Sequence, residues 1–372
     1  MKKVGLLAGL VVFVLMAGSA AAKKGDIIVG DSNNAEVIRV NPKTGAKDVI
    51  SDDPRLATPN DTVFGRDGTI YVSDYGSGAE EPAVFSINPK TGATEILSDD
   101  PRFGTLDGIA MGPDGDLYVT DIDASSASDH PALFRIDLPS GATSPVSTDP
   151  LLNGGPIGVV VPPNGTPIVG QTELIARVDP ETGVATTIAD TGDGLQGGEG
   201  LARGPDGTLY VIDYSGGAGL EAIDPKSARV SSLSGPIPFY DGYGLAYDFH
   251  GRVIFQGGTS VYSANIGTGG VRTIAEDFGY PEGLEVEPPK CKGKTATIVG
   301  STKKDKLKGS KFKDVIHTLG GKDKVNAKGG NDIVCGGGGK DKLKGSKGKD
   351  KLFGQAGKDK LDGGPGRDKE RQ

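Results

Sequence analysis

The last part of the chain carries carboxylates at a fixed spacing. From Gly300 onward an Asp recurs at every ninth position, eight times in register: Asp305, Asp314, Asp323, Asp332, Asp341, Asp350, Asp359 and Asp368. Six of them follow a Gly by two positions: Gly321, Gly330, Gly339, Gly348, Gly357 and Gly366. Glycine permits tight turns that turn backbone carbonyls inward, and Ca²⁺ binds carboxylate and carbonyl oxygens. The spacing therefore predicts a row of calcium sites built from these Asp and Gly residues.

An apolar position in the same unit indicates how the carboxylates are held. It lies two residues after each of the first seven Asp residues, at Leu307, Ile316, Val325, Val334, Leu343, Leu352 and Leu361. The resulting pattern, G-G-x-G-x-D-x-U-x with U apolar, resembles the calcium-binding nonapeptide of repeats-in-toxin (RTX) proteins. The resemblance implies a parallel β-roll over residues 300–372, with calcium ions held between successive turns.

The repeats at the two ends depart from this pattern. Lys303 and Phe312 stand where the first two repeats should have the turn Gly, and Glu370 stands at the apolar position of the last repeat. Terminal repeats of such arrays are often atypical because they cap the stack. We expect the first two repeats to bind calcium weakly or to act as a cap, and the last repeat to be a frayed cap.

Lysines flank most of the Asp residues, as in KDKLK from Lys340 and KDKLF from Lys358. Side chains alternate between the two faces of a strand, so inward Asp and Leu residues place these lysines outward. The interior is then a column of carboxylates with one apolar residue in nine. We expect the tail to be disordered without calcium and folded with it, with affinity of about 10⁻⁴ to 10⁻³ M per site. The alternative is a Gly- and Lys-rich tail that never folds.

Charge divides the chain into two parts. Residues 23–289 carry 16 basic and 39 acidic side chains, whereas residues 290–372 carry 23 basic and 10 acidic ones. The change falls at Pro288-Pro289, so residues 289–299 are predicted to be a linker leading into the roll. The outward lysines suggest docking on an anionic cell-envelope polymer or on the acidic first domain. Nucleic acid is not expected as a partner, because only Phe312 and Phe353 interleave the basic residues.

The first part of the chain is itself repetitive. Six related segments recur about every 40 to 50 residues: GDIIVGD, DGTIYVSD, DGDLYVTD, NGTPIVGQ, DGTLYVID and HGRVIFQG. Most begin with a hairpin turn such as Asp-Gly and continue as a short β-rich run. A further strand precedes most of these segments. Two more strands come after each segment, joined by a turn that Pro and Gly mark, so each unit has four strands. Six such units with no helical periodicity predict a β-propeller over residues 23–288.

Two of these units carry a longer shared pattern, GIAMGPDGDLYVTD from Gly108 and GLARGPDGTLYVID from Gly200. It resembles the six-bladed propeller family of NHL repeats, gluconolactonase-like proteins and virginiamycin B lyase-like proteins. The segment EGLEVEP from Glu282 has the sequence of an innermost strand, and it is predicted to close the ring in the blade begun by GDIIVGD. The predicted fold is all-β, a six-bladed β-propeller followed by a parallel β-roll.

The resemblance implies that the residue before the inner-strand Gly faces the central channel. That position holds Asn60, Asp107, Ile157, Glu199, Tyr243 and Glu282. Gluconolactonase-like enzymes bind a channel metal through Glu, Asn and Asp, so Asn60, Asp107, Glu199 and Glu282 are candidate metal ligands in this chain. The alternative is a chance grouping in a domain that is acidic throughout.

No catalytic residue can be assigned. The three histidines, His130, His250 and His317, have no ligand or acid-base spacing, and none stands at an inner-strand position. We therefore favour a non-enzymatic calcium-binding protein whose propeller binds an unknown ligand or acts as a scaffold. The alternative is a metal-dependent lactonase or lyase that uses a cation in the channel.

The chain begins like an exported protein. Lys2 and Lys3 precede an apolar run and a small-residue cleavage site at 20–22, so residues 1–22 are predicted to be a signal peptide. The run is too short to span a bilayer, so no transmembrane segment is expected after its removal. We expect a secreted, extracellular or envelope-associated protein. In such an oxidising place Cys291 and Cys335 are expected to form one disulfide, with two free thiols as the alternative.

Overall fold

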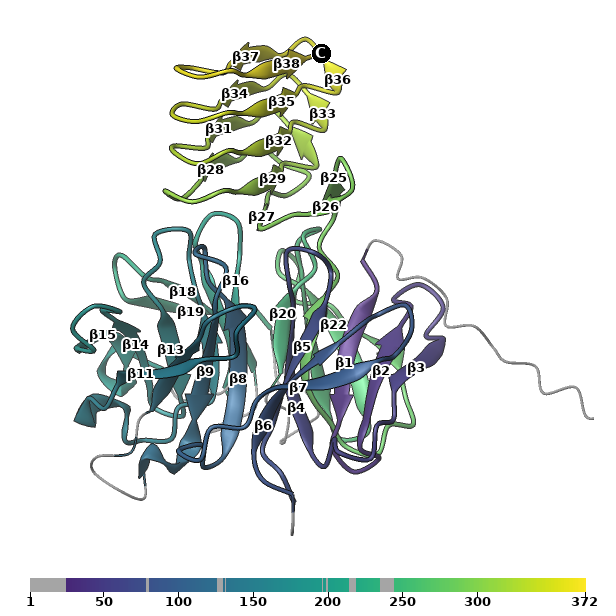
Figure 1. Cartoon of the computed structure of the whole chain (residues 1–372), viewed down its shortest axis with the longest axis vertical. Coiled ribbons are helices and arrows are strands. Elements are labelled where there is room, and N and C mark those ends of the chain that lie inside the picture. The colour runs from purple at the N-terminus through teal and green to yellow at the C-terminus, as the bar shows by residue number, and fades with distance from the viewer. Residues whose placement is uncertain are drawn as a thin grey trace, which may run out of the picture.

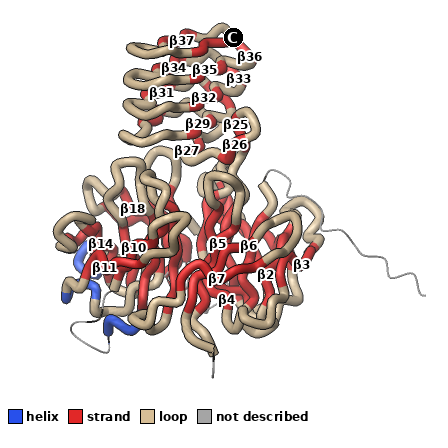
Figure 2. Tube along the Cα trace, viewed as in Figure 1, coloured by secondary structure: helices blue, strands red, loops and turns tan. Residues whose placement is uncertain are grey.

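The computed structural model describes residues 25–77, 80–125, 130, 132–195, 197, 198, 200–213, 219–234 and 244–372. It is a ring of six four-stranded sheets, with a stack of short coils standing on one face of the ring (Figure 1). Strands form nearly all of the regular structure in these ranges (Figure 2), and short 3-10 helices occur at Ile122–Ser125, Pro150–Leu152 and Thr191–Asp193. The predicted all-β fold is confirmed. The expected signal peptide lies outside the described residues.

Each blade of the ring is an antiparallel sheet of four strands, ordered from the inside outward. Blade one is β24 (Pro281–Val286), β1 (Ile27–Asp31), β2 (Glu36–Val40) and β3 (Lys47–Ser51). Blade two is β4 (Pro59–Phe64), β5 (Ile70–Asp74), β6 (Ala83–Ile87) and β7 (Thr94–Ser98). Blade three is β8 (Leu106–Met111), β9 (Leu117–Asp121), β10 (Leu133–Ile136) and β11 (Thr143–Ser147).

The other three blades repeat the arrangement. Blade four is β12 (Gly158–Val160), β13 (Ile168–Gln171), β14 (Leu174–Val178) and β15 (Ala185–Asp190). Blade five is β16 (Leu201–Arg203), β17 (Leu209–Asp213), β18 (Gly219–Asp224) and β19 (Arg229–Ser232). Blade six is β20 (Leu245–Tyr247), β21 (Arg252–Gly257), β22 (Ser260–Asn265) and β23 (Val271–Ala275). The sequence predicts six units of four strands, and both numbers are confirmed.

The ring closes where the sequence predicts. β24 pairs with β1 in antiparallel register, with Val286 opposite Ile27. The Asp31 carboxylate, at the end of β1, accepts hydrogen bonds of 2.8 Å from the backbone N–H groups of Gly279 and Tyr280. Asp74 and Asp121 end the equivalent strands of the next two blades and also bind loop backbone. The recurrent Asp of the propeller repeat is therefore structural.

Apolar side chains fill the spaces between blades and form the propeller core. One of these clusters contains Ile28, Phe64, Ile70 and Phe85, from the first and second blades. Another joins the sixth blade to the closing strand, through Ile254 and Leu284. Burial of apolar surface between neighbouring sheets is the main source of stability in such a ring, and none of it depends on an ion.

The inner strands line a channel and follow one another in the order β24, β4, β8, β12, β16, β20, after which β20 contacts β24 again. In this ring of six, β16 lies opposite β4.

The coils on top form a parallel β-roll of 18 residues per coil, two nonapeptides each. One sheet contains β27 (Ile298–Val299), β29 (Val315–His317), β32 (Ile333–Cys335), β35 (Lys351–Phe353) and β38 (Lys369–Arg371). The opposite sheet contains β28 (Lys306–Lys308), β31 (Lys324–Asn326), β34 (Lys342–Lys344) and β37 (Lys360–Asp362). A narrow third sheet contains β30 (Gly320–Gly321), β33 (Gly338–Gly339) and β36 (Ala356–Gly357).

The alternation predicted for the roll is present. In β34 the side chains of Lys342 and Lys344 are exposed, whereas Leu343 is buried. The apolar residues of successive coils stack in a thin core, in which Leu343 pairs with Val325 on one side and Leu361 on the other.

A disulfide holds the base of the roll. Cys291 lies in β25 (Lys290–Cys291), which forms a hairpin with β26 (Lys294–Thr295), and it bonds to Cys335 in β32. Both cysteines are buried, with Cα atoms 5.8 Å apart. The disulfide between the start of the tail and its fourth repeat is confirmed, and the free-thiol alternative is wrong.

Candidate calcium sites and the propeller channel

The repeated Asp residues form two columns in the roll, because coils of 18 residues place every second Asp on the same edge. In both columns the Oδ1 atom of one Asp accepts a hydrogen bond from the backbone N–H of the Asp one coil earlier. Six such bonds, from Asp305–Asp323 to Asp350–Asp368, measure 2.8 to 2.9 Å. This ladder holds each carboxylate in one orientation.

The second carboxylate oxygen has no such partner through most of the roll. The Oδ2 atoms without a hydrogen bond are buried ones, belonging to Asp323, Asp332, Asp341, Asp350 and Asp359. Thr318 lies beside the first of these, but its hydroxyl donates to the Gly336 carbonyl. Leaving a charged oxygen buried and unpaired is costly, so the columns are built for a cation.

The pKa values of the Asp residues in the two columns reflect the same cost of burying a charge. Burial raises the pKa of Asp323 to about 6 and that of Asp332 to about 7, with repulsion from neighbouring Asp residues adding to it. Burial also raises the pKa of Asp341 and Asp350, again helped by the next Asp in the column. A bound divalent cation would reverse this balance, because it favours the ionised carboxylates.

Glycines make the space into which these oxygens point. A Cβ added to Gly336 would lie 2.8 Å from Asp341 Oδ2 and 2.8 Å from the Gly354 carbonyl oxygen. A Cβ on Gly345 would likewise lie 2.3 Å from Asp350 Oδ2 and 2.7 Å from the carbonyl oxygen of Gly363. Carboxylate and carbonyl oxygens therefore converge on a cradle that any side chain would fill, which fits calcium, a cation that takes six to eight oxygen ligands.

The turn glycines two positions before the Asp residues serve a different purpose. A Cβ on Gly339, Gly348 or Gly357 would lie 1.5 Å from the carbonyl oxygen of the Gly one coil earlier. Their φ angles of 137 to 142° are also in the region that favours glycine. These glycines let successive coils approach closely and keep their carbonyls along the edge of the roll.

The first coil is built differently. Ser301 donates to Asp305 Oδ2 through its backbone N–H at 2.6 Å and through its hydroxyl at 3.1 Å. Ser310 makes the corresponding bonds to Asp314 Oδ2, at 2.7 and 3.0 Å. The carboxylates of Asp305 and Asp314 are thus satisfied by protein groups, which supports the expectation that the first two repeats form a cap.

The last repeat ends the stack in a similar way. Asp368 accepts from the Asp350 backbone, but Glu370 occupies the apolar position with an exposed side chain and accepts a hydrogen bond from the Gly363 N–H. The repeats most complete as cation sites are therefore those of Asp341, Asp350 and Asp359.

The channel residues singled out in the sequence are only partly brought together. Asn60, Asp107 and Glu282 are all buried on inner strands, and Glu199 lies outside the described residues. Asn60 and Asp107 line one small cavity of about 20 Å³, whereas Glu282 does not line it and accepts a hydrogen bond from Ser32 Oγ at 3.4 Å. Across the described ranges, no three His, Cys, Asp or Glu side chains converge to hold a metal ion. The channel metal stays a prediction.

Three charged residues of the channel were missed in the sequence. Asp61 stands where the other five inner strands have Gly, Glu285 where they have Val or Ala, and Arg203 where they have Phe, Met, Val or Tyr. Comparing all positions of the inner strand among the six repeats, rather than one position, would have found them.

The two acids lie next to each other at the junction of β4 and β24. Burial raises the pKa of Asp61 to about 7, although the Ile109 and Thr62 N–H groups donate to its carboxylate. Burial, followed by repulsion from Asp61, raises the pKa of Glu285 to about 8. Near neutral pH Glu285 is therefore mostly protonated and Asp61 is partly protonated.

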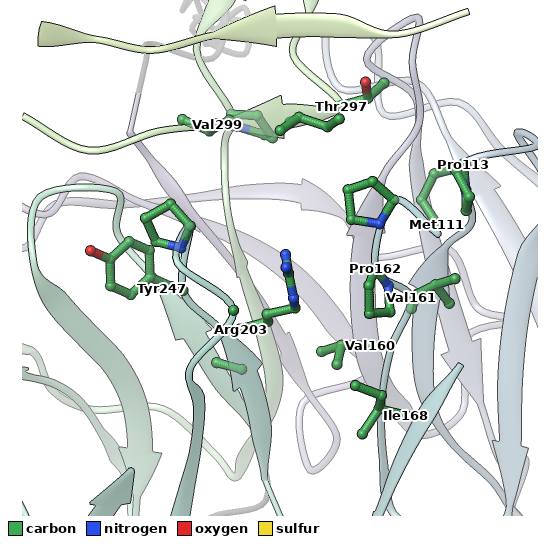
Figure 3. Close-up of a pocket in the computed structure, with 18 of the residues that line it drawn as sticks. Met111, Pro113, Val160, Val161, Pro162, Ile168, Arg203, Tyr247, Thr297 and Val299 are labelled. Atoms are coloured by element: carbon green, nitrogen blue, oxygen red, sulfur yellow. The ribbon is translucent and has the colours of Figure 1, made fainter. Parts of the chain in front are cut away.

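Above these residues the channel widens into a cavity of about 1070 Å³ (Figure 3). Its walls come from the inner strands and their loops, with Met111, Val160 and Tyr247 among the lining residues. Its roof is the start of the roll, where Thr297 and Val299 face the propeller.

Comparison with known proteins agrees with both halves of this description. Residues 299–334 and 336–370 match the RTX calcium-binding nonapeptide repeat, in four copies. The tail therefore consists of RTX repeats. No curated protein matches the sequence of the chain.

Solved structures of propeller proteins resemble about 70% of the chain. A chain of the nidogen/laminin complex is 14% identical with a TM-score of 0.56, covering 70% of this chain and 97% of that one. TolB from Acinetobacter baumannii is 14% identical with a TM-score of 0.56, covering 71% and 67%. Virginiamycin B lyase from Staphylococcus aureus is 16% identical with a TM-score of 0.52, covering 71% and 86%. At these identities the likeness concerns the fold.

Proposed function

We propose that this protein is a secreted calcium-binding protein in which calcium completes the roll of residues 300–372. The propeller of residues 23–288 serves as a binding module, and residues 289–299 link the two. The observation that carries the proposal is the set of buried Oδ2 atoms that have no hydrogen-bond partner, of which those of Asp341, Asp350 and Asp359 face a glycine-lined cradle. The ions are held by the carboxylates of Asp341, Asp350 and Asp359, with weaker sites at Asp323 and Asp332.

A calcium titration of the full chain by calorimetry and circular dichroism tests the proposal. Replacing Asp341 and Asp350 with Asn keeps the shape of the side chains but removes their charge. We expect the calcium concentration at half-folding to rise by about 10-fold or more, since hydrogen bonds and ion contacts to charged groups contribute about 1.5 to 3 kcal/mol. Equal β content in calcium and in chelator would contradict the proposal.

The same repeat array offers a matched control. Asp362 is an exposed acid in β37, outside the nine-residue register. Asp362→Asn changes the net charge as each site substitution does, and it should leave the calcium titration unchanged.

Export and envelope binding are parts of the proposal that rest on other observations. RTX repeats match the tail, and no helix in the described part of the chain is long and apolar enough to cross a membrane. The lysines of the β34 and β35 rows point outward, as contact with an anionic envelope polymer requires. Such binding should weaken as salt rises, because the Debye length is about 8 Å at physiological ionic strength. Polymer binding that is independent of salt would exclude this electrostatic contact.

A further inference from the structure

The roll lies over one mouth of the propeller channel (Figure 1). Thr297, Val299 and Leu307 line the cavity from the roll, opposite Val160 and Leu201 on the propeller side. Charged groups of the two domains are close enough to interact. Burial raises the pKa of Asp314 in the roll, and Arg66 of the propeller lowers it. Asp305 of the roll adds to the raised pKa of Tyr247 in the propeller. The cavity is therefore a chamber between the two domains that stays partly open to solvent.

The first coil forms this roof without needing an ion. Its two Asp carboxylates are satisfied by Ser301 and Ser310, and the disulfide ties the hairpin beneath it to the second coil. A roof of this kind keeps the chamber in one shape. The volume of the chamber is close to that of small-molecule sites, which is commonly about 300 to 1,000 Å³.

The chamber is cationic although the propeller is acidic. Among the described residues, seven basic side chains and five carboxyl groups line it. Four of the basic residues come from the propeller, and Lys306, Lys308 and Lys328 come from the roll. Residues 23–289 as a whole contain 39 acidic and 16 basic side chains. The lining thus has the opposite sign to its surroundings, which attracts anions.

Arg203 is the charged group at the centre of the chamber. Its side chain extends from β16 into the cavity, below Thr297 and Val299 (Figure 3). The guanidinium is half-buried, and within the described residues it has no hydrogen-bond or ion-pair partner. Burial lowers the pKa of Arg203, and the exposed Asp206 raises it by less. Guanidinium groups bind carboxylates through paired N–H donors, and desolvation makes such a contact stronger.

We propose that the chamber binds a small amphipathic carboxylate, whose anionic group pairs with Arg203 and whose apolar body packs on the aliphatic walls. The walls supply the apolar contacts through Met111, Val160 and Val161. Asp61 lies on β4, opposite β16 in the ring, and Glu285 lies on the neighbouring β24, so neither acid is on the strand next to Arg203. This inference rests on the proposed role of the propeller as a binding module, and it names the class of ligand.

Calorimetric titration of the calcium-loaded full chain with octanoate, 1-octanol and octylammonium tests the proposal. The three probes share one apolar chain and differ in charge. We expect octanoate to bind at one site per chain, 1-octanol to bind at least about 10-fold more weakly, and octylammonium to give no binding heat. Absence of octanoate binding, or equal affinity for all three, would overturn the proposal.

Variants locate the site. Arg203→Met should weaken octanoate binding about 10-fold or more, and Arg203→Lys should weaken it less because it keeps the charge. Arg229→Met is the matched control and should leave octanoate binding unchanged, since Arg229 is exposed on β19 and does not line the chamber. Val299→Trp should weaken binding by narrowing the chamber beneath the roof. Unchanged binding in Arg203→Met would refute the assignment.

Calcium titration of the same preparations separates this inference from the proposed function. The Arg203 variants should give the wild-type calcium isotherm. If the wild-type chain binds calcium but not octanoate, the chamber proposal fails alone. If the wild-type chain does not bind calcium, the proposed function of the roll fails.

Discussion

The propeller and the roll are both repeat structures, yet they are stabilised in opposite ways. The propeller blades bury side chains such as Phe85, Phe134 and Phe255 against their neighbours, so the clusters between the blades are apolar. Each of the first six nonapeptides of the roll buries its Asp carboxylate and the aliphatic residue two positions later. A repeat can therefore dispense with a large core when an ion takes its place. The propeller should fold without calcium, whereas the roll should require calcium to fold.

The largest expected effect comes from a glycine that separates the coils. Gly339→Ala places a Cβ 1.5 Å from the Gly321 carbonyl oxygen at a φ of 137°, so the coils must move apart and the cradles open. We expect loss of calcium-induced folding in the roll and an unchanged propeller, as measured by circular dichroism and hydrogen exchange.

The adjacent glycine is the control for that substitution. A Cβ on Gly338 would meet no atom within 4 Å. Gly338→Ala should therefore fold with calcium as the wild type does, and failure of both variants equally would refute the steric explanation.

The disulfide should have the next largest effect. Cys335→Ser removes a crosslink between residues 44 apart, which typically costs about 2 to 4 kcal/mol of unfolding free energy. The roll should need more calcium to fold, while the melting temperature of the propeller stays the same. A fall in propeller stability of equal size would show that the two parts unfold together, contrary to the comparison.

The propeller should in turn respond to pH through its channel acids. The pKa of Glu285 is raised to about 8, so the folded state holds a proton that the unfolded chain releases above about pH 4.5. The propeller should lose stability as pH rises from about 5 to 9, with a melting temperature lower by roughly 2 to 4 °C for each kcal/mol lost. Glu285→Gln should flatten this dependence, and an unchanged pH profile would contradict the assignment.

The smallest expected effect concerns the cap. Ser310→Ala removes a hydroxyl that donates to Asp314, which should cost about 1 kcal/mol in the first coil. Ser346 occupies the same position in the sixth repeat, but it has a φ of 77° and donates to the exposed Asn326. Ser346→Ala should leave thermal stability unchanged, and a larger effect there than at Ser310 would contradict the cap.

Much of the fold could be predicted because it depends on local periodicity. The two-residue alternation of strands places Asp341 and Leu343 inward and Lys342 outward, and the hairpin turns of the propeller repeat mark its blades. The closing strand at Glu282 could be found because it is an inner strand without its own hairpin.

The remaining features depend on contacts between distant residues. The roof over the channel depends on how Thr297 and Val299 meet the propeller, which no repeat pattern contains. The cap at Ser301 depends on a backbone conformation, since Ser346 at the same repeat position does not make that bond. Arg203 and Glu285 could have been found, because each breaks an otherwise apolar position of the inner strand.

Hydrogen exchange of the full chain, measured segment by segment in calcium and in chelator, tests most directly whether the roll alone depends on the ion. We predict that the segments around Asp341 and Asp350 are protected only in calcium, while the strands β1, β5 and β9 are protected equally in both conditions. Protection of the roll without calcium, or calcium-dependent protection of those propeller strands, would contradict this division between the two domains.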